Sequence, residues 1–117
     1  MHRGHTMSKV KISFVLPQAM QQELKETMIR EGYDLKGKSR WVSEAIDSLL
    51  ELQTYADLVK INDEMSGFEK LESVVIGRDL KQQLDNAVIV VRKQYPAIEG
   101  VQSRILRTAI MQRLLFA

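Results

Sequence analysis

The chain contains no cysteine, which excludes disulfide bonds and thiolate metal sites and fits a reducing compartment. It has no apolar run near the roughly eighteen residues that a membrane span needs. It also lacks the succession of basic, apolar and small residues that marks a signal peptide. We therefore expect a cytoplasmic protein that does not enter a membrane.

Residues that carry catalysis are equally scarce. The two histidines, His2 and His5, have no third metal ligand near them in the sequence. The chain shows neither a glycine-rich phosphate loop nor a nucleophile–histidine–carboxylate set. We therefore expect no metal, no cofactor and no enzymatic activity.

The composition is that of one folded domain or two very small ones. The 117 residues are 44% hydrophobic and 27% charged, unlike a disordered chain. The formal net charge is only +2, but residues 1–40 carry +4, residues 41–70 carry −5 and residues 71–117 carry +3. Two basic segments flank an acidic connector, and such local fields can steer a polyanion to the protein.

A repeated pattern is the most informative feature of the sequence. Ser39-Arg40…Ala45-Ile46 returns as Ser103-Arg104…Ala109-Ile110, sixty-four positions later. The apolar stripe Met20, Leu24 and Met28 returns as Leu80, Leu84 and Val88, sixty positions later. Matched helices in the same order predict an internal duplication.

The first copy is predicted to be a strand followed by two helices. Residues 9–16 alternate between polar and apolar side chains, which is typical of a half-buried strand. Pro17 ends the strand, and the stripe from Met20 predicts an amphipathic helix that reaches about Glu31 before Gly32. A second helix is expected to start between residues 37 and 39, with its apolar side facing inward.

The second copy repeats this order after the connector. We divide the chain into a first module at 9–52, an acidic and partly helical connector at 53–70, and a second module at 71–117. In the connector, either the preceding helix continues or a short extra helix forms. Residues 71–76 are expected to form the second strand, and Pro96 to end the helix after it. Glu72 falls where Ile12 is expected to be buried, so either the register differs or Glu72 lies at a frayed strand end.

The first module resembles the ribbon-helix-helix family of the MetJ/Arc type. The resemblance rests on Lys-Val-Lys-Ile-Ser-Phe-Val-Leu-Pro at 9–17 and on Gly-Lys-Ser-Arg-Trp-Val-Ser-Glu-Ala-Ile at 37–46. Two copies in one chain are similar to the tandem TraY type of conjugative plasmids. The resemblance implies a mainly α fold in which two strands pair as an antiparallel ribbon that enters the DNA major groove.

The resemblance also implies which residues face DNA. In the first strand these are Lys11, Ser13 and Val15; in the second they are Leu71, Ser73 and Val75, of which Ser73 and Val75 are retained as candidate base contacts. Lysine can donate to guanine, and valine suits a thymine methyl group. The alternative for the first strand is that these positions form only its solvated side. The alternative for the second strand, which has no basic residue at these places, is that it mainly completes the sheet.

The starts of the two second helices are candidate phosphate sites. Free amides and the helix dipole attract anions there. The candidate side chains are Lys38, Ser39 and Arg40 in the first copy and Gln102, Ser103 and Arg104 in the second, with Lys9 of the first strand as a further contact. Many family members have an acidic residue where Arg40 and Arg104 stand. Ser39 and Ser103 could also act as ordinary helix caps, which is compatible with phosphate binding at the same helix ends. Trp41 matches Ile105, so we expect it to pack in the core or at its rim, with stacking on a base as the alternative.

The leading functional hypothesis is a sequence-specific regulator of transcription that binds double-stranded DNA. The alternatives are a relaxosome accessory protein that binds a plasmid transfer origin, and an antitoxin-like interaction protein. The helical end of the sequence, without a long tail, is an argument against the last. The modules could pair within one chain as a pseudo-dimer or between two chains as a homodimer, and could assemble further on DNA. We predict pairing within the chain.

Overall fold

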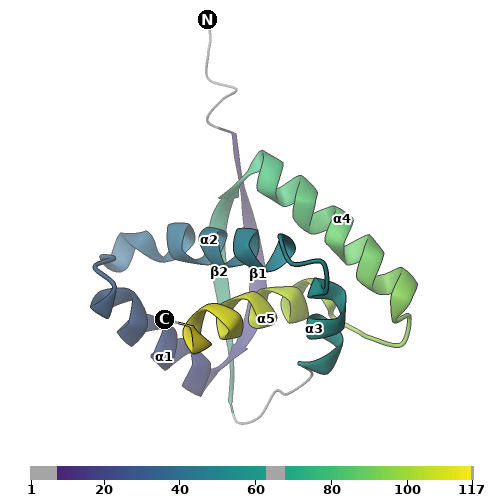
Figure 1. The fold of residues 1–117 in the computed structure, drawn as a ribbon. Helices are drawn as coiled ribbons and strands as arrows, with labels where there is room; N and C mark the ends of the chain where they lie inside the picture. Colours follow the sequence, from purple (N-terminus) through teal and green to yellow (C-terminus); the bar gives the residue numbers. More distant parts are fainter. Residues whose placement is uncertain (1–7, 63–67, 117) are drawn as a thin grey trace, which may run out of the picture.

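The computed structural model describes residues 8–62 and 68–116, so His2 and His5 lie outside the described residues. The described elements are β1 (Lys9–Pro17), α1 (Gln18–Arg30), the 3-10 turn η2 (Leu35–Gly37), α2 (Lys38–Leu50), α3 (Tyr55–Ile61), β2 (Glu69–Gly77), α4 (Arg78–Gln94) and α5 (Val101–Leu115). The prediction of a mainly helical protein with a short antiparallel β-ribbon is confirmed (Figure 1).

The two strands pair with each other, which confirms the prediction of pairing within the chain. They run antiparallel, with Ser13 opposite Ser73 at the centre of the register. These serines are sixty positions apart, the same spacing that relates Met20 to Leu80. The centre of the register therefore pairs two positions that have the spacing of the sequence repeat.

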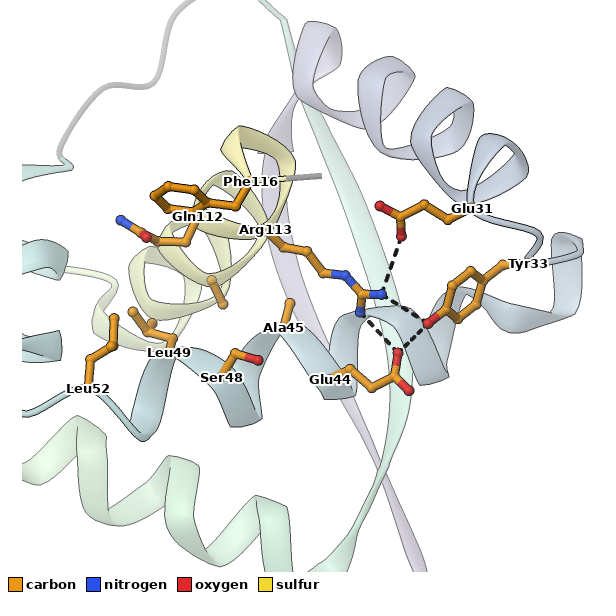
Figure 2. A pocket seen from close by; sticks show the side chains of 11 residues that line it. Glu31, Tyr33, Glu44, Ala45, Ser48, Leu49, Leu52, Gln112, Arg113 and Phe116 are labelled. Atoms are coloured by element: carbon orange, nitrogen blue, oxygen red, sulfur yellow. Dashed lines mark hydrogen bonds and ion pairs between the residues drawn. The ribbon is translucent and has the colours of Figure 1, made fainter.

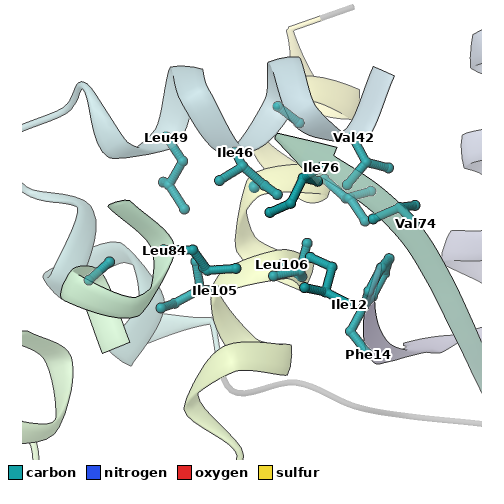
Figure 3. Packing of buried hydrophobic residues seen from close by; sticks show 14 of the residues in the cluster. Ile12, Phe14, Val42, Ile46, Leu49, Val74, Ile76, Leu84, Ile105 and Leu106 are labelled. Atoms are coloured by element: carbon teal, nitrogen blue, oxygen red, sulfur yellow. The ribbon is translucent and has the colours of Figure 1, made fainter. Parts of the chain in front are cut away.

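One face of the ribbon is buried beneath the helices, because the alternation in both strands places apolar side chains on the same side. Ile12 and Phe14 from β1 meet Val74 and Ile76 from β2 in the core (Figure 3). α2 and α5 cross this face, as Figure 1 shows. β1 also contributes the fully buried Leu16. The helices contribute the other fully buried large side chains: Leu24, Trp41, Val42, Ile46, Leu49, Leu84, Ile105, Leu106 and Ile110. Both copies thus share one core, and a two-stranded ribbon needs such a cover to be stable.

The second strand is longer than predicted, and the explanation of Glu72 as a frayed strand end is wrong. β2 begins at Glu69 rather than at residue 71, and Glu72 pairs opposite Phe14 well inside the ribbon. Its side chain points into the buried face and is only 9% exposed. The register does not slip, because polar partners from α1 and α2 satisfy this carboxylate.

The helix starts also differ from expectation in one respect. Gly37 and Gly100 occupy the N-cap positions of α2 and α5, and neither helix has a side-chain capping hydrogen bond. Gly100 has φ +59°, a left-handed conformation that glycine adopts without strain. Capping by Ser39 and Ser103 was therefore a wrong prediction, and both side chains are left for other contacts.

The connector forms the short helix α3 rather than an extension of α2. Ala56 and Val59 are buried against the second copy. The hydroxyl of Tyr95 donates to Asp57, and Nδ2 of Asn62 donates to Oγ1 of Thr108 at 3.1 Å. These contacts attach α3 to α4 and α5.

Candidate nucleic-acid interface

The face of the ribbon that points away from the helices carries the side chains expected to read bases. Lys11 lies opposite Val75, Ser13 opposite Ser73, and Val15 opposite Leu71. Lys11 and Ser13 are exposed, and so are Leu71 and Val75, at 75% and 40%. Val15 and Ser73 are half-buried. All of the candidate base contacts therefore share one accessible face, and Leu71 joins them.

This outward face differs between its two ends. At one end Lys9 pairs with Gly77, the residue that precedes Arg78 of α4, and Lys11 pairs with Val75. At the other end Val15 and Leu71 are paired, and Glu69 lies opposite Pro17. One end can donate hydrogen bonds and attract phosphate, whereas the other offers apolar contacts and one carboxylate.

The first turns of α2 and α5 hold the two edges of the ribbon. The N–H of Val75 donates to Oγ of Ser39 at 2.9 Å. On the other strand, Nε2 of Gln102 donates to the carbonyl oxygen of Ser13 at 3.3 Å. These bonds satisfy backbone groups that an edge strand leaves unpaired. Ser39 and Gln102 thus lie beside the ribbon, where they position the helix starts against it.

The basic residues of the two helix starts are placed unequally. Arg40 is exposed, and its guanidinium lies 4.7 Å from the centroid of the Tyr33 ring. Its repeat counterpart Arg104 points to α3, where Nη2 donates to the carbonyl oxygens of Val59 at 2.9 Å and Lys60 at 2.8 Å. Arg104 therefore holds the C-terminal turn of α3, which differs from the phosphate contact expected for it. Ser103 is half-buried on the same turn.

Lys38, also expected at phosphate, forms an ion pair instead. Its Nζ lies 2.5 Å from Oε1 of Glu72. Gln21 donates to the other oxygen of the same carboxylate. Burial raises the pKa of Glu72, but the hydrogen bonds from Lys38 and Gln21 and the charges of Lys38 and Lys25 outweigh it, so the pKa is lowered. Glu72 is thus held ionised beneath the ribbon.

Sequence reasoning missed Arg107, which lies against the edge of β1. Nη1 of Arg107 donates to the carbonyl oxygen of Val15 at 3.3 Å. Its side chain is buried, and within the described residues its Nε has no hydrogen-bond partner. Burial and the neighbouring Arg104 lower the pKa of Arg107, although the charge of Glu69 opposes them. No local pattern distinguishes this arginine, because its contact is with a strand ninety-two positions earlier.

Metal-ligand clusters and membrane-spanning helices are not found among residues 8–62 and 68–116. That part of the chain has no cluster of three or more metal-ligating His, Cys, Asp or Glu side chains. None of its helices combines the length and the hydropathy needed to cross a membrane. Comparisons of the chain with protein-family models, with curated proteins and with solved structures found no match.

Proposed function

We propose that this chain is a tandem ribbon-helix-helix protein that binds double-stranded DNA in a sequence-specific manner and regulates transcription. β1 and β2 enter the major groove with their outward side chains toward the bases. The observation that carries the proposal is the register that pairs Lys11 with Val75, Ser13 with Ser73 and Val15 with Leu71 on one accessible face.

The dimensions and chemistry of this face suit the major groove. A two-stranded ribbon fits the groove width, and each base pair presents a distinct set of donors, acceptors and methyl groups there. Lys11 donates to guanine O6 or N7, and the central serines donate or accept. Val15, Leu71 and Val75 contact thymine methyl groups. A purely solvated strand face does not require two large apolar side chains as exposed as Leu71 and Val75.

Phosphate contacts come from the groups that the fold leaves accessible. Lys9 lies at one end of the ribbon, and Arg40 lies in the first turn of α2. The amides at the starts of α2 and α5 flank the two ribbon edges, where they attract the DNA backbone. Arg104 is not assigned to phosphate, because its guanidinium is engaged with α3.

The proposal is tested by selecting binding sites for the full chain from a pool of random DNA duplexes. Affinities for the selected duplex and for a scrambled duplex are then compared for wild type, Lys11→Ala/Ser13→Ala and Lys93→Ala. Lys93 is a matched control because it lies in the last turn of α4 and is exposed. We expect the double substitution to cost about 1–3 kcal/mol on the selected duplex and little on the scrambled one.

Two outcomes would contradict the proposal. One is that no sequence is enriched from the pool. The other is that the double substitution weakens binding to both duplexes equally, which would show that Lys11 and Ser13 do not contact bases. The genomic position of the enriched sequence separates the two biological roles: a promoter supports transcriptional regulation, whereas a transfer origin supports a relaxosome accessory protein.

A further inference from the structure

A hollow of about 670 Å³ lies between the C-terminal halves of α2 and α5 (Figure 2). Four pairs of its lining residues are related by the sixty-four-position spacing of the repeat: Ala45 and Ala109, Ser48 and Gln112, Leu49 and Arg113, and Leu52 and Phe116. The hollow therefore lies where equivalent faces of the two helices meet. Its volume is in the range of small-molecule sites.

The two copies differ at the polar wall of the hollow, where Arg113 occupies the position that matches Leu49. Nη1 of Arg113 donates to the carbonyl oxygen of Trp41 at 2.9 Å and to Oε1 of Glu44 at 3.0 Å. Its Nη2 donates to the hydroxyl of Tyr33 at 2.9 Å and to Oε1 of Glu31 at 3.3 Å. The four hydrogens on these two nitrogens are thus all used within the protein.

The polar groups of this wall that remain available for a ligand include two carboxylate oxygens, which are hydrogen-bond acceptors. Within the described residues, no hydrogen bond reaches Oε2 of Glu31 or Oε2 of Glu44. Two carboxylates line the hollow, compared with one guanidinium. Arg40 interacts with the Tyr33 ring but does not line the hollow. An anion would meet two carboxylates and an arginine whose Nη groups are already hydrogen-bonded, whereas a cation would find acceptors.

The opposite walls are apolar. Leu49 is buried at the base, while Leu52 is 43% exposed and Phe116 is 82% exposed at the rim. Across the hollow from the carboxylates, the exposed ring of Phe116 and the side chain of Leu52 suit the apolar body of an organic cation (Figure 2). We propose that this hollow binds an organic cation with an apolar body, whose ammonium group lies against Glu31 and Glu44 and whose apolar part lies between Leu52 and Phe116.

The test uses dansylcadaverine, a fluorescent primary amine, and its acidic analogue dansyl-6-aminohexanoic acid, titrated with the full chain in the absence of DNA. We expect saturable one-to-one binding of the amine with a blue-shifted emission, and no saturable binding of the acid. Glu31→Gln/Glu44→Gln is expected to weaken amine binding about tenfold or more, because it removes both charged acceptors. Glu99→Gln, an exposed carboxylate outside the hollow, is the matched control.

A second variant keeps the test decisive if the double substitution unfolds the protein. Phe116→Ala removes an exposed ring outside the core, so we expect an intact fold and a several-fold loss of amine affinity, because the apolar body loses its contact with the ring. Equal binding of the acid, unchanged affinity in both variants, or absence of saturable binding would overturn the proposal. Displacement of the dye by protein self-association, seen as a doubled mass in sedimentation, would instead assign the hollow to a second copy and also overturn it.

Discussion

Nζ of Lys38 in α2 lies 2.5 Å from Oε1 of Glu72 in β2, and this pair allows a carboxylate to occupy the buried face of the ribbon. The repeat counterpart of Glu72 is Ile12, an ordinary core residue. The ion pair thus joins the start of α2 to the second strand at the point where the two copies differ most. It also removes Lys38 from the set of free cations beside the ribbon.

Glu72→Gln is expected to lower the free energy of unfolding by about 1–3 kcal/mol at pH 7, because charge-assisted bonds from Lys38 and Gln21 are weakened. The folded-state pKa of Glu72 is lowered, so its contribution is present above the unfolded-state pKa of roughly 4.3 and is lost as the pH falls through the folded-state value. Urea unfolding of both proteins between pH 7 and pH 2.5 measures this. A difference that persists at the acidic end would show that the charge of Glu72 is not what stabilises the fold.

Arg104→Ala is expected to loosen α3, because the carbonyl oxygens of Val59 and Lys60 lose their common donor. We expect faster hydrogen exchange at the C-terminal amides of α3 and a loss of about 1–2 kcal/mol in local stability. Arg92→Ala, an exposed arginine in the last turn of α4, is the control. Unchanged exchange in α3 would mean that packing of Ala56 and Val59 alone holds this helix.

Arg40→Ala is expected to weaken binding to all DNA sequences by a similar factor. If Arg40 neutralises one phosphate, the slope of log affinity against log salt becomes shallower by roughly one. Fluorescence anisotropy across a salt series measures the slope. Arg104→Ala is the matched comparison, because we expect it to leave the slope unchanged while it disturbs α3. An equal change of slope in both variants would show that Arg104 contacts phosphate as Arg40 does, as the repeat predicted.

Replacement of thymine by deoxyuridine in the selected duplex is expected to weaken binding at positions that face the apolar end of the ribbon. The change removes only the C5 methyl group, which Val15 and Leu71 are positioned to contact. The loss should be smaller in Val15→Ala/Leu71→Ala than in wild type, as a double-mutant cycle would reveal. If the free-energy losses from the protein variant and from the deoxyuridine substitution simply add, Val15 and Leu71 do not contact the thymine methyl groups.

The elements that bury one regular face could be predicted from the sequence. The alternation in residues 9–16 predicted β1, and the stripe of Met20, Leu24 and Met28 predicted α1 to within one residue of its observed end at Arg30. Trp41 is fully buried, as its match to Ile105 predicted. These features are local, because each requires only that side chains on one face be apolar.

The features that could not be predicted depend on contacts between distant segments. Glu72 interrupts the apolar face of β2, and the compensation by Lys38 lies thirty-four positions away. Arg104 matches Arg40 in sequence, but it contacts carbonyl groups of α3, the short helix that follows α2. The sequence shows only that Arg113 stands at the position that matches Leu49 in the first copy. Only the structure shows the tyrosine and the two glutamates around it.

The pairing of β1 with β2 in one polypeptide has a consequence for assembly. The ribbon forms in a first-order folding reaction, so its population does not fall on dilution as that of a ribbon shared by two separate chains would. The two strands are also encoded separately. A substitution beside Ser13 alters one half of the outward face and leaves the half around Ser73 unchanged, whereas in a homodimer every substitution appears twice. Each half of this surface is therefore free to diverge without altering the other.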